Sequence, residues 1–367
     1  MKKLFVAFIA LSVLLCACTK KKDAEVVHIA LSANTNILNT NAPVIRSYLS
    51  AKNEAKVLSN FIRSNFKFNR IVAFTINDDY GLSFVKEFEK YIDAEKFVNV
   101  NVEYGQQDFK NLIIKEKFIL NDIVIIIEHG TQVSYNLIKQ LKTYHPEIQI
   151  FSNSSIASSS IVNNLNNTYT DGLICSTTPF DLGIYNAKAK KFINDYQNEY
   201  KSSNINLGQA FAYDAIINYF AVNNNFLKKS VTKIGAVLPL TGNYAWFGEL
   251  NAKAISLAVK NINTYDKHID LSILDNKSTI KDGITAAKKL LYQEKVDVII
   301  STPSSLSLAI NELIGSNLNG DKIKNMYAEL FNNSSGVIGE FSYSNDGDII
   351  SNVSIGVFKD GELKPYE

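Results

Sequence analysis

The stretch KIGAVLPLTGNYAWFGE, residues 233–249, combines several local signals in a fixed order. Its apolar run at 234–238 predicts a buried strand, and a turn containing proline and glycine follows. Three aromatic residues come next, and apolar residues then recur at helical spacing over 250–262. Such a strand, loop and helix are typical of the first unit of an α/β domain. Here they begin only after almost two thirds of the 367 residues.

The rest of the chain alternates between strand-like and helix-like segments. Residues 123–127 read IVIII and are apolar at every position, as in a parallel strand covered on both faces. Repeated strand–helix units predict parallel sheets between helices, and the units are too numerous for one compact sheet. We therefore predict an α/β protein of two Rossmann-like lobes. The expected strands are 28–31, 70–76, 98–105, 123–127, 148–151, 172–177, 234–238, 269–274, 296–300, 337–343 and 353–358, and the expected helices are 83–92, 135–144, 184–202, 208–225, 250–262, 279–293, 304–314 and 320–331.

The N-terminus has the pattern of a secretory signal. Two lysines precede a short apolar run that ends LCAC at 15–18, which is similar to the bacterial lipobox. We expect a lipoprotein signal peptide at 1–17, lipidation of Cys18 and a polar tether at 18–25, which together anchor the chain without a membrane span. Cys16 is the poorer acceptor because a bulky leucine precedes it. An ordinary signal peptide with two incidental cysteines is the alternative.

Charge and motifs argue against several classes of protein. Removal of the signal peptide, with Lys2 and Lys3, lowers the 38 basic residues to 36, against 36 acidic residues. A balanced chain gives no electrostatic case for nucleic acid. The four histidines lack metal spacing, and no phosphate-binding glycine loop or nucleophile elbow is found. Cys175 lies in an apolar run and is expected to be a buried small residue. We expect no enzymatic activity, cofactor or metal.

Several blocks resemble the periplasmic leucine/isoleucine/valine-type binding proteins, the type I solute-binding components of ABC importers. Residues 72–92 resemble a strand of the second lobe, its Asp-containing turn ending in Tyr-Gly, and the helix after it. Residues 103–113 resemble the entry to the next helix, and 210–219 resemble an Ala-Tyr-Asp-Ala helix. Residues 336–349 resemble the closing Gly-x-x-Gly strand and Asp-Gly-Asp hairpin. The matches touch nearly all of the mature chain.

The order of these blocks differs from the order in that family. The block that resembles 233–316 comes first there, so the resemblance implies a circularly permuted order, tolerated where chain ends lie in exposed loops. A coincidental βα segment and a disrupted gene are the alternatives. The implied parts are lobe 1 (26–50 plus 179–337), lobe 2 (51–178 plus 338–367) and a three-strand hinge with crossovers near Ser50, Thr178 and Val337.

The same resemblance implies a cleft that binds the carboxylate of a small ligand. Ser304 and Ser305 lie between a buried strand and a helix, which supplies N–H groups and hydroxyls, and they match carboxylate-binding serines. Plain helix capping is the alternative. Ser32 and Asn34 lie in a loop that resembles a Ser-Ala-Thr-Asn ligand loop, with Asn34 where threonine is usual.

Aromatic residues are expected to wall the cleft. Tyr80 matches an aromatic of the cleft, with a simple turn residue as the alternative. Phe247 matches a second one, and Trp246 is its neighbour and the only tryptophan. Packing on the surface of the lobe is the alternative for both. Aromatic side chains at these places could contact an apolar part of the ligand.

The partner for an ammonium group is missing from its usual place. Ser154 stands where the family has an acid, and Gly130 stands where it has an aromatic residue. A hydroxyl leaves most of an ammonium charge uncompensated in a closed cleft. Glu128 is a candidate substitute, and a neutral or anionic ligand is the alternative.

The resemblance implies a monomeric extracytoplasmic protein, which the lipobox-like N-terminus would anchor to the membrane as a lipoprotein. It would capture an amino acid or related compound between its lobes and deliver it to ABC permease subunits. The alternative is an envelope lipoprotein that uses the same fold as a regulatory or interaction module, as the activators of peptidoglycan synthases do. Loss of the usual acid fits either function.

Overall fold

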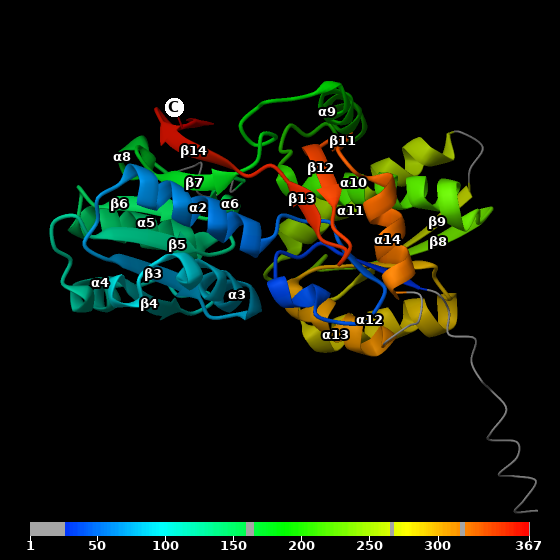
Figure 1. The fold of residues 1–367 in the computed structure, drawn as a ribbon, viewed down its shortest axis with the longest axis horizontal. Helices are drawn as coiled ribbons and strands as arrows, with labels where there is room; N and C mark the ends of the chain where they lie inside the picture. Colours follow the sequence, from blue (N-terminus) through cyan, green and yellow to red (C-terminus); the bar gives the residue numbers. More distant parts are fainter. Residues whose placement is uncertain (1–25, 159–164, 265–267, 316–319, 367) are drawn as a thin grey trace, which may run out of the picture.

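The computed structural model describes residues 26–158, 165–264, 268–315 and 320–366. Two large sheets, each with its own helices, lie side by side in Figure 1, and a small sheet lies beside them. Most strand pairs in the two large sheets are parallel. The predicted α/β class with parallel-dominated sheets is therefore confirmed.

Lobe 1 is built around a sheet of five parallel strands in the spatial order β2-β1-β10-β8-β9. The strands are β1 (Val27–Ala30), β2 (Val44–Arg46), β8 (Val231–Leu238), β9 (His268–Asp275) and β10 (Val298–Ser301). Strand β8 pairs with β10, and β10 pairs with β1. The apolar run at 234–238 thus lies in one parallel sheet with strands from the first and last thirds of the chain.

Helices cover both faces of this sheet. The core on one face joins the apolar side chains of four helices to alternate residues of the strands. These helices are α9 (Ala187–Tyr200), α10 (Leu207–Val222), α11 (Ala245–Asn263) and α14 (Gly320–Leu330). On the other face pack α12 (Ile280–Lys288) and α13 (Ser304–Ile314). The short helix η1 (Thr35–Leu38) follows β1, and π-helical turns at Asn223–Leu227 and Lys289–Glu294 extend α10 and α12.

Lobe 2 is built around a seven-stranded sheet in the order β15-β14-β7-β6-β5-β3-β4. The strands are β3 (Ile71–Ile76), β4 (Phe97–Val102), β5 (Ile123–Ile127), β6 (Gln149–Ser152), β7 (Ile174–Thr177), β14 (Ser354–Lys359) and β15 (Glu362–Pro365). Strands β3 and β5 are buried at every position, as expected for strands covered on both faces. The helical elements are α2 (Ala51–Asn65), α3 (Asp79–Phe88), η2 (Glu89–Tyr91), η3 (Ala94–Lys96), α4 (Lys110–Glu116), α5 (Gln132–Tyr144), α6 (Ser154–Ala157) and α8 (Asn167–Thr170).

Helix α2 is absent from the helices expected above. Its buried stripe contains Ala51, Glu54, Ala55, Leu58 and Ile62 at helical spacing. The segment reads as polar because lysine, asparagine and serine fill the other positions and a glutamate occupies one buried position.

The C-terminal strands pair differently from expectation. The turn at 345–348 joins β12 (Gly339–Tyr343) to the short strand β13 (Ile349–Ser351), not to the strand at 353–358. With β11 (Ser334–Gly336) these strands form the small sheet, which packs into the core of lobe 1. Strand β14 instead pairs antiparallel with β7 of lobe 2. We therefore propose that the last passage between lobes lies at 352–353, and not near Val337.

The two large sheets share one pattern of strand order. In lobe 2, the parallel strands taken in chain order from β3 occupy the spatial order 2-1-3-4-5. Lobe 1 has the same order only if its strands are counted from β8, through β9 and β10, to β1 and β2. This order reverses beside the first strand, and such a reversal is where open α/β sheets bind ligands.

Candidate functional site

A cavity lies where the loops that follow the strands of both lobes meet. Including the part open to solvent, its volume is about 830 Å³. Lobe 1 contributes loops after β1, β8 and β10, and lobe 2 contributes loops after β3, β5 and β6. The lining residues are Leu31, Ser32, Ala33, Tyr48, Glu54, Tyr80, His129, Ser154, Ser155, Ser158, Asn206, Gly208, Pro239, Tyr244, Trp246, Phe247, Thr302, Pro303 and Ser304.

One wall of the cavity is the N-terminus of α13. Ser304 is the first residue of this helix, and the Ser32 hydroxyl donates to the Ser304 hydroxyl over 2.8 Å. The first N–H groups of a helix have no partner within the helix, so this end attracts an anion. Ser305, the second residue of the helix, is half-buried and is not among the residues that line the cavity. Of the two predicted serines, the structure brings Ser304 to the cavity, together with Ser32.

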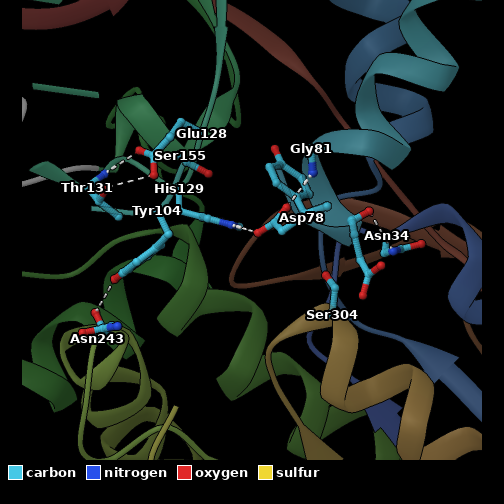
Figure 2. A network of polar contacts seen from close by, with 12 residues as sticks. Asn34, Asp78, Gly81, Tyr104, Glu128, His129, Thr131, Ser155, Asn243 and Ser304 are labelled. Atoms are coloured by element: carbon cyan, nitrogen blue, oxygen red, sulfur yellow. Dashed lines mark hydrogen bonds and ion pairs between the residues drawn. The ribbon is translucent and has the colours of Figure 1, made fainter. Parts of the chain in front are cut away.

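Asn34 links the two lobes instead of lining the cavity. Its amide donates to the Asp79 carbonyl over 3.0 Å, and its side-chain oxygen accepts from the Asn36 N–H over 2.8 Å. The next residue, Thr35, donates its N–H to the Ser83 hydroxyl. In Figure 2, Asn34 lies near Ser304, on the side where lobe 1 meets α3. Its position makes it a contact between lobes.

Aromatic residues from both lobes line the cavity. Tyr80 is buried at the start of α3, and its hydroxyl accepts from the Asn153 amide. Trp246 and Phe247 pack edge to face at the start of α11, and Phe247 also contacts Tyr48. The sequence motifs gave no indication of Tyr48, which follows the short strand β2. These rings can enclose an apolar group.

The Glu128 carboxylate has local partners. It accepts hydrogen bonds from the N–H and hydroxyl of Thr131 and from the Ser134 hydroxyl, as Figure 2 shows for Thr131. These groups belong to the start of α5, so Glu128 ties β5 to the helix that follows it. Glu128 is fully buried and lies outside the cavity lining.

A different acid lies beside Ser154. Glu54, on the first turn of α2, accepts from the Ser154 N–H, from the Ser154 hydroxyl over 3.1 Å and from the Ser176 hydroxyl over 2.7 Å. Burial raises the pKa of the Glu54 carboxyl to about 7, although these three hydrogen bonds oppose the rise. The motifs did not identify Glu54. The sequence feature that could have identified it is a glutamate at helical spacing from the apolar residues of α2.

A second polar pair lies at the cavity. His129 contacts Asp78 through Nε2 and Oδ2 at 2.6 Å, and its ring packs against Tyr80 and Tyr244. Burial acts to lower the pKa of His129, but the hydrogen bond and charge of Asp78 raise it overall. Close by, the Tyr104 hydroxyl of lobe 2 donates to the Asn243 carbonyl of lobe 1 (Figure 2). Figure 2 shows this second contact between lobes apart from Asn34.

Other expectations concern metals and membranes. Within the described residues, no group of three or more histidine, cysteine or acidic side chains could hold a metal ion. No helix in the same residues is long and apolar enough to span a bilayer. Cys175 is buried with a free thiol, as expected for a small core residue. Cys18, the signal peptide and the tether lie outside the described residues.

Comparisons with known proteins agree on one fold. A family model described as periplasmic binding protein matches residues 17–222 and 231–318. A search of curated proteins found no match. Similar solved structures include a solute-binding protein of an ABC transporter from Rhodopseudomonas palustris in complex with 3,4-dihydroxybenzoic acid, with 12% identity over 94% of this chain and 72% of that chain and a TM-score of 0.52.

Two further structures are comparably similar. A protein from Rhodospirillum rubrum, provisionally described as a branched-chain amino acid ABC transporter, has 12% identity over 91% of this chain and 70% of that chain, with a TM-score of 0.51. A type 1 periplasmic binding protein from Bordetella pertussis has 14% identity over 93% and 74%, with a TM-score of 0.50. Identities this low indicate a shared fold and do not identify a ligand.

Proposed function

Because this chain belongs to the periplasmic binding protein family, we propose that it is an extracytoplasmic solute-binding protein that captures a small ligand for an ABC importer. The observation that carries the proposal is the cavity between the lobes, lined by residues from both. A ligand bound there contacts both lobes and favours their closure by hinge motion. Its role is binding and delivery, without chemical conversion of the ligand.

The lining supports an amino acid or a related compound as the ligand. The N-terminus of α13, with Ser32 and Ser304, offers N–H groups and hydroxyls to a carboxylate. Tyr80, Trp246 and Phe247 offer apolar surface to the rest of the molecule. The solved relatives include one described as a branched-chain amino acid transporter and one bound to an aromatic acid, which fits a carboxylate in this position.

We further propose that a lipid on Cys18 anchors the protein at the membrane as a monomer. The lipobox-like sequence at 15–18 supports this anchor, and 18–25 then forms a short tether. The partners of the anchored protein are the permease subunits of an ABC importer.

The order of the chain is proposed to be a circular permutation of the family order. The support is that lobe 1 reaches the common 2-1-3-4-5 strand order, which lobe 2 also has, only when counting begins at β8. The segment before β8 joins α10 of lobe 1 to a strand of the same lobe, so the rearrangement stays within one lobe.

The test of ligand capture uses the fluorescence of Trp246, which is the only tryptophan and lines the cavity. Amino acids and small carboxylates, titrated one at a time, are expected to change its emission saturably for at least one compound. Replacement Ser304→Ala removes a hydroxyl at the anion end and is expected to weaken that binding about tenfold, the effect of about 1.4 kcal/mol. Ser203→Ala, in an exposed loop, is the matched control with unchanged affinity.

An absence of any saturable change, repeated by calorimetry, would contradict solute capture. Proteins that copurify with the membrane-anchored chain would then indicate whether it acts as an envelope interaction module. Co-purification with permease subunits that depends on bound ligand is the result expected for an importer component.

A further inference from the structure

We infer that Glu54 is the counter-ion of a cationic nitrogen on the ligand, so that the cavity selects compounds that carry a protonated amine. The inference rests on the proposed function and identifies a residue that determines specificity. Glu54 comes from α2, an element that none of the sequence motifs included.

The carboxylate of Glu54 is held in the wall of the cavity. The residue has a relative exposure of 1%, yet it belongs to the lining. Donors from the loop after β6 and from β7 fix both oxygens: Oε1 accepts from the Ser154 N–H and the Ser176 hydroxyl, and Oε2 accepts from the Ser154 hydroxyl. A carboxylate has about four acceptor positions, so these three bonds leave capacity on Oε2.

Among the residues that the structure describes, no cation is found to offset the charge of this carboxylate. None of the ion pairs among the described residues includes Glu54. The titratable groups that interact with the charge of Glu54 are Tyr48, Tyr80 and Cys175, and none of them is a cation. The charge of a second acid, Asp181, also acts on Tyr48 and Cys175. On α2 itself, Lys52 and Lys56 are exposed.

A buried carboxylate without a cation is costly, and this cost falls when a cationic ligand enters. Consistently, burial raises the pKa of the Glu54 carboxyl to about 7 in the ligand-free protein. The rings of Tyr48 and Tyr80 add surfaces that attract cations. The end of α13, with Ser304, lies on the other lobe and favours an anion. The cavity is therefore polarised, and a small zwitterion with its nitrogen towards Glu54 satisfies both ends.

The test compares matched probes on the full mature chain and on Glu54→Gln. The probes are the twenty protein amino acids, the same carbon skeletons without the amine, and the same skeletons without the carboxylate. Trp246 emission and calorimetry report affinity at pH 8. Glutamine keeps the acceptor for the Ser154 N–H and Ser176 hydroxyl and can donate to the Ser154 hydroxyl, so it preserves the local hydrogen bonds. The control is Glu87→Gln, which replaces a buried glutamate of α3 that pairs with Lys90 of η2.

We expect every compound that binds the unsubstituted protein to carry an amine, and its amine-free counterpart to bind at least about thirtyfold more weakly. Glu54→Gln should abolish this difference, whereas Glu87→Gln should retain it. If amine-free acids bind as tightly as amino acids, and Glu54→Gln has no effect, solute capture stands and the role of Glu54 is wrong.

A second measurement needs no ligand. A pKa raised from 4.5 to about 7 means that the folded protein loses stability as the pH rises through this window, since the charged form is disfavoured. Glu54→Gln should therefore raise the melting temperature at pH 8 and leave it nearly unchanged at pH 5. A lower melting temperature at pH 8 would identify Glu54 as a structural hydrogen-bond acceptor and overturn the inference, even if no probe binds.

Discussion

At the scale of single residues, the site depends on side chains that hold loops as well as on those that line the cavity. Arg46, at the end of β2, is buried and donates to the carbonyls of Ala33 and Asn34 over 3.0 and 2.8 Å. Its Nε forms an ion pair with Asp348 at 2.8 Å, from the turn between β12 and β13. Arg46 thus connects the loop of Ser32 to the small sheet.

Replacement Arg46→Met is expected to destabilise the protein by about 3 kcal/mol, because half-buried Asp348 then loses its ion-pair partner. The lost bonds to Ala33 and Asn34 should also weaken ligand binding by freeing the Ser32 loop. Urea unfolding measures the stability change, and the double variant Arg46→Met with Asp348→Asn should recover part of it. Equal stability of both variants would contradict the proposed coupling of Arg46 to Asp348.

Two buried glutamates, Glu128 and Glu54, show how much of a side chain's surroundings can be predicted from the local sequence. The motif that contains Glu128 indicated an acid near the cavity, but the Glu128 carboxylate instead accepts hydrogen bonds from Thr131 and Ser134 at the start of α5. Glu54 lies 100 residues from Ser154 and 122 residues from Ser176. No local pattern links these three positions, because the contacts form only when α2 packs beside β6 and β7.

At the scale of elements, periodicity predicts most strands and helices close to their observed bounds. Strand β5 and helix α13 match expectation to the residue, because strict apolar runs and helical spacing leave few alternatives. Helix α2 was missed because a glutamate interrupts its apolar stripe. A buried glutamate breaks the apolar periodicity by which helices are predicted from sequence. Here that glutamate, Glu54, lies in the candidate site.

The approach of α11 to the loop after β8 is close at one glycine. A Cβ on Gly248 would lie 1.9 Å from the Pro239 carbonyl oxygen, so any side chain there must move the helix or the loop. We expect Gly248→Ala to displace Trp246 and Phe247, weaken ligand binding at least tenfold and cost about 1–3 kcal/mol of stability. Fluorescence titration and urea unfolding check both effects.

The control for this prediction is Ser256→Ala, two turns further along α11, which should change neither quantity appreciably. Wild-type affinity in Gly248→Ala would show that the start of α11 can move without loss of the cavity, and would contradict a role for this close approach.

At the scale of the whole molecule, the proposed permutation predicts that the usual order of segments gives the same fold. A chain rearranged to 231–318, then 26–226, then 320–367, with short flexible linkers at the junctions, keeps every strand of lobe 1 in its sheet. We expect it to fold with an unchanged circular dichroism spectrum and to bind ligand within about threefold of the original chain, because junctions in loops are tolerated.

A control chain that begins at residue 280 interrupts the unit formed by β9 and α12 and is expected to be less stable. If the rearranged chain fails to fold with linkers of several lengths, the native order contributes more than connectivity, and the proposed equivalence of the two orders is wrong.

The sequence by itself determined that the chain is an α/β protein of two parallel-sheet lobes, that β8 starts a new unit, and that serines and aromatic residues follow several of its strands. These features depend on short-range periodicity and turn residues, which a single sequence displays. Tertiary structure decided which of these residues meet. It brought Ser32 to Ser304, turned Asn34 towards Asp79, retained Glu128 at α5 and placed Glu54 beside Ser154. The physical reason is that the cavity forms between loops far apart in the chain, so its charge depends on how the lobes pack.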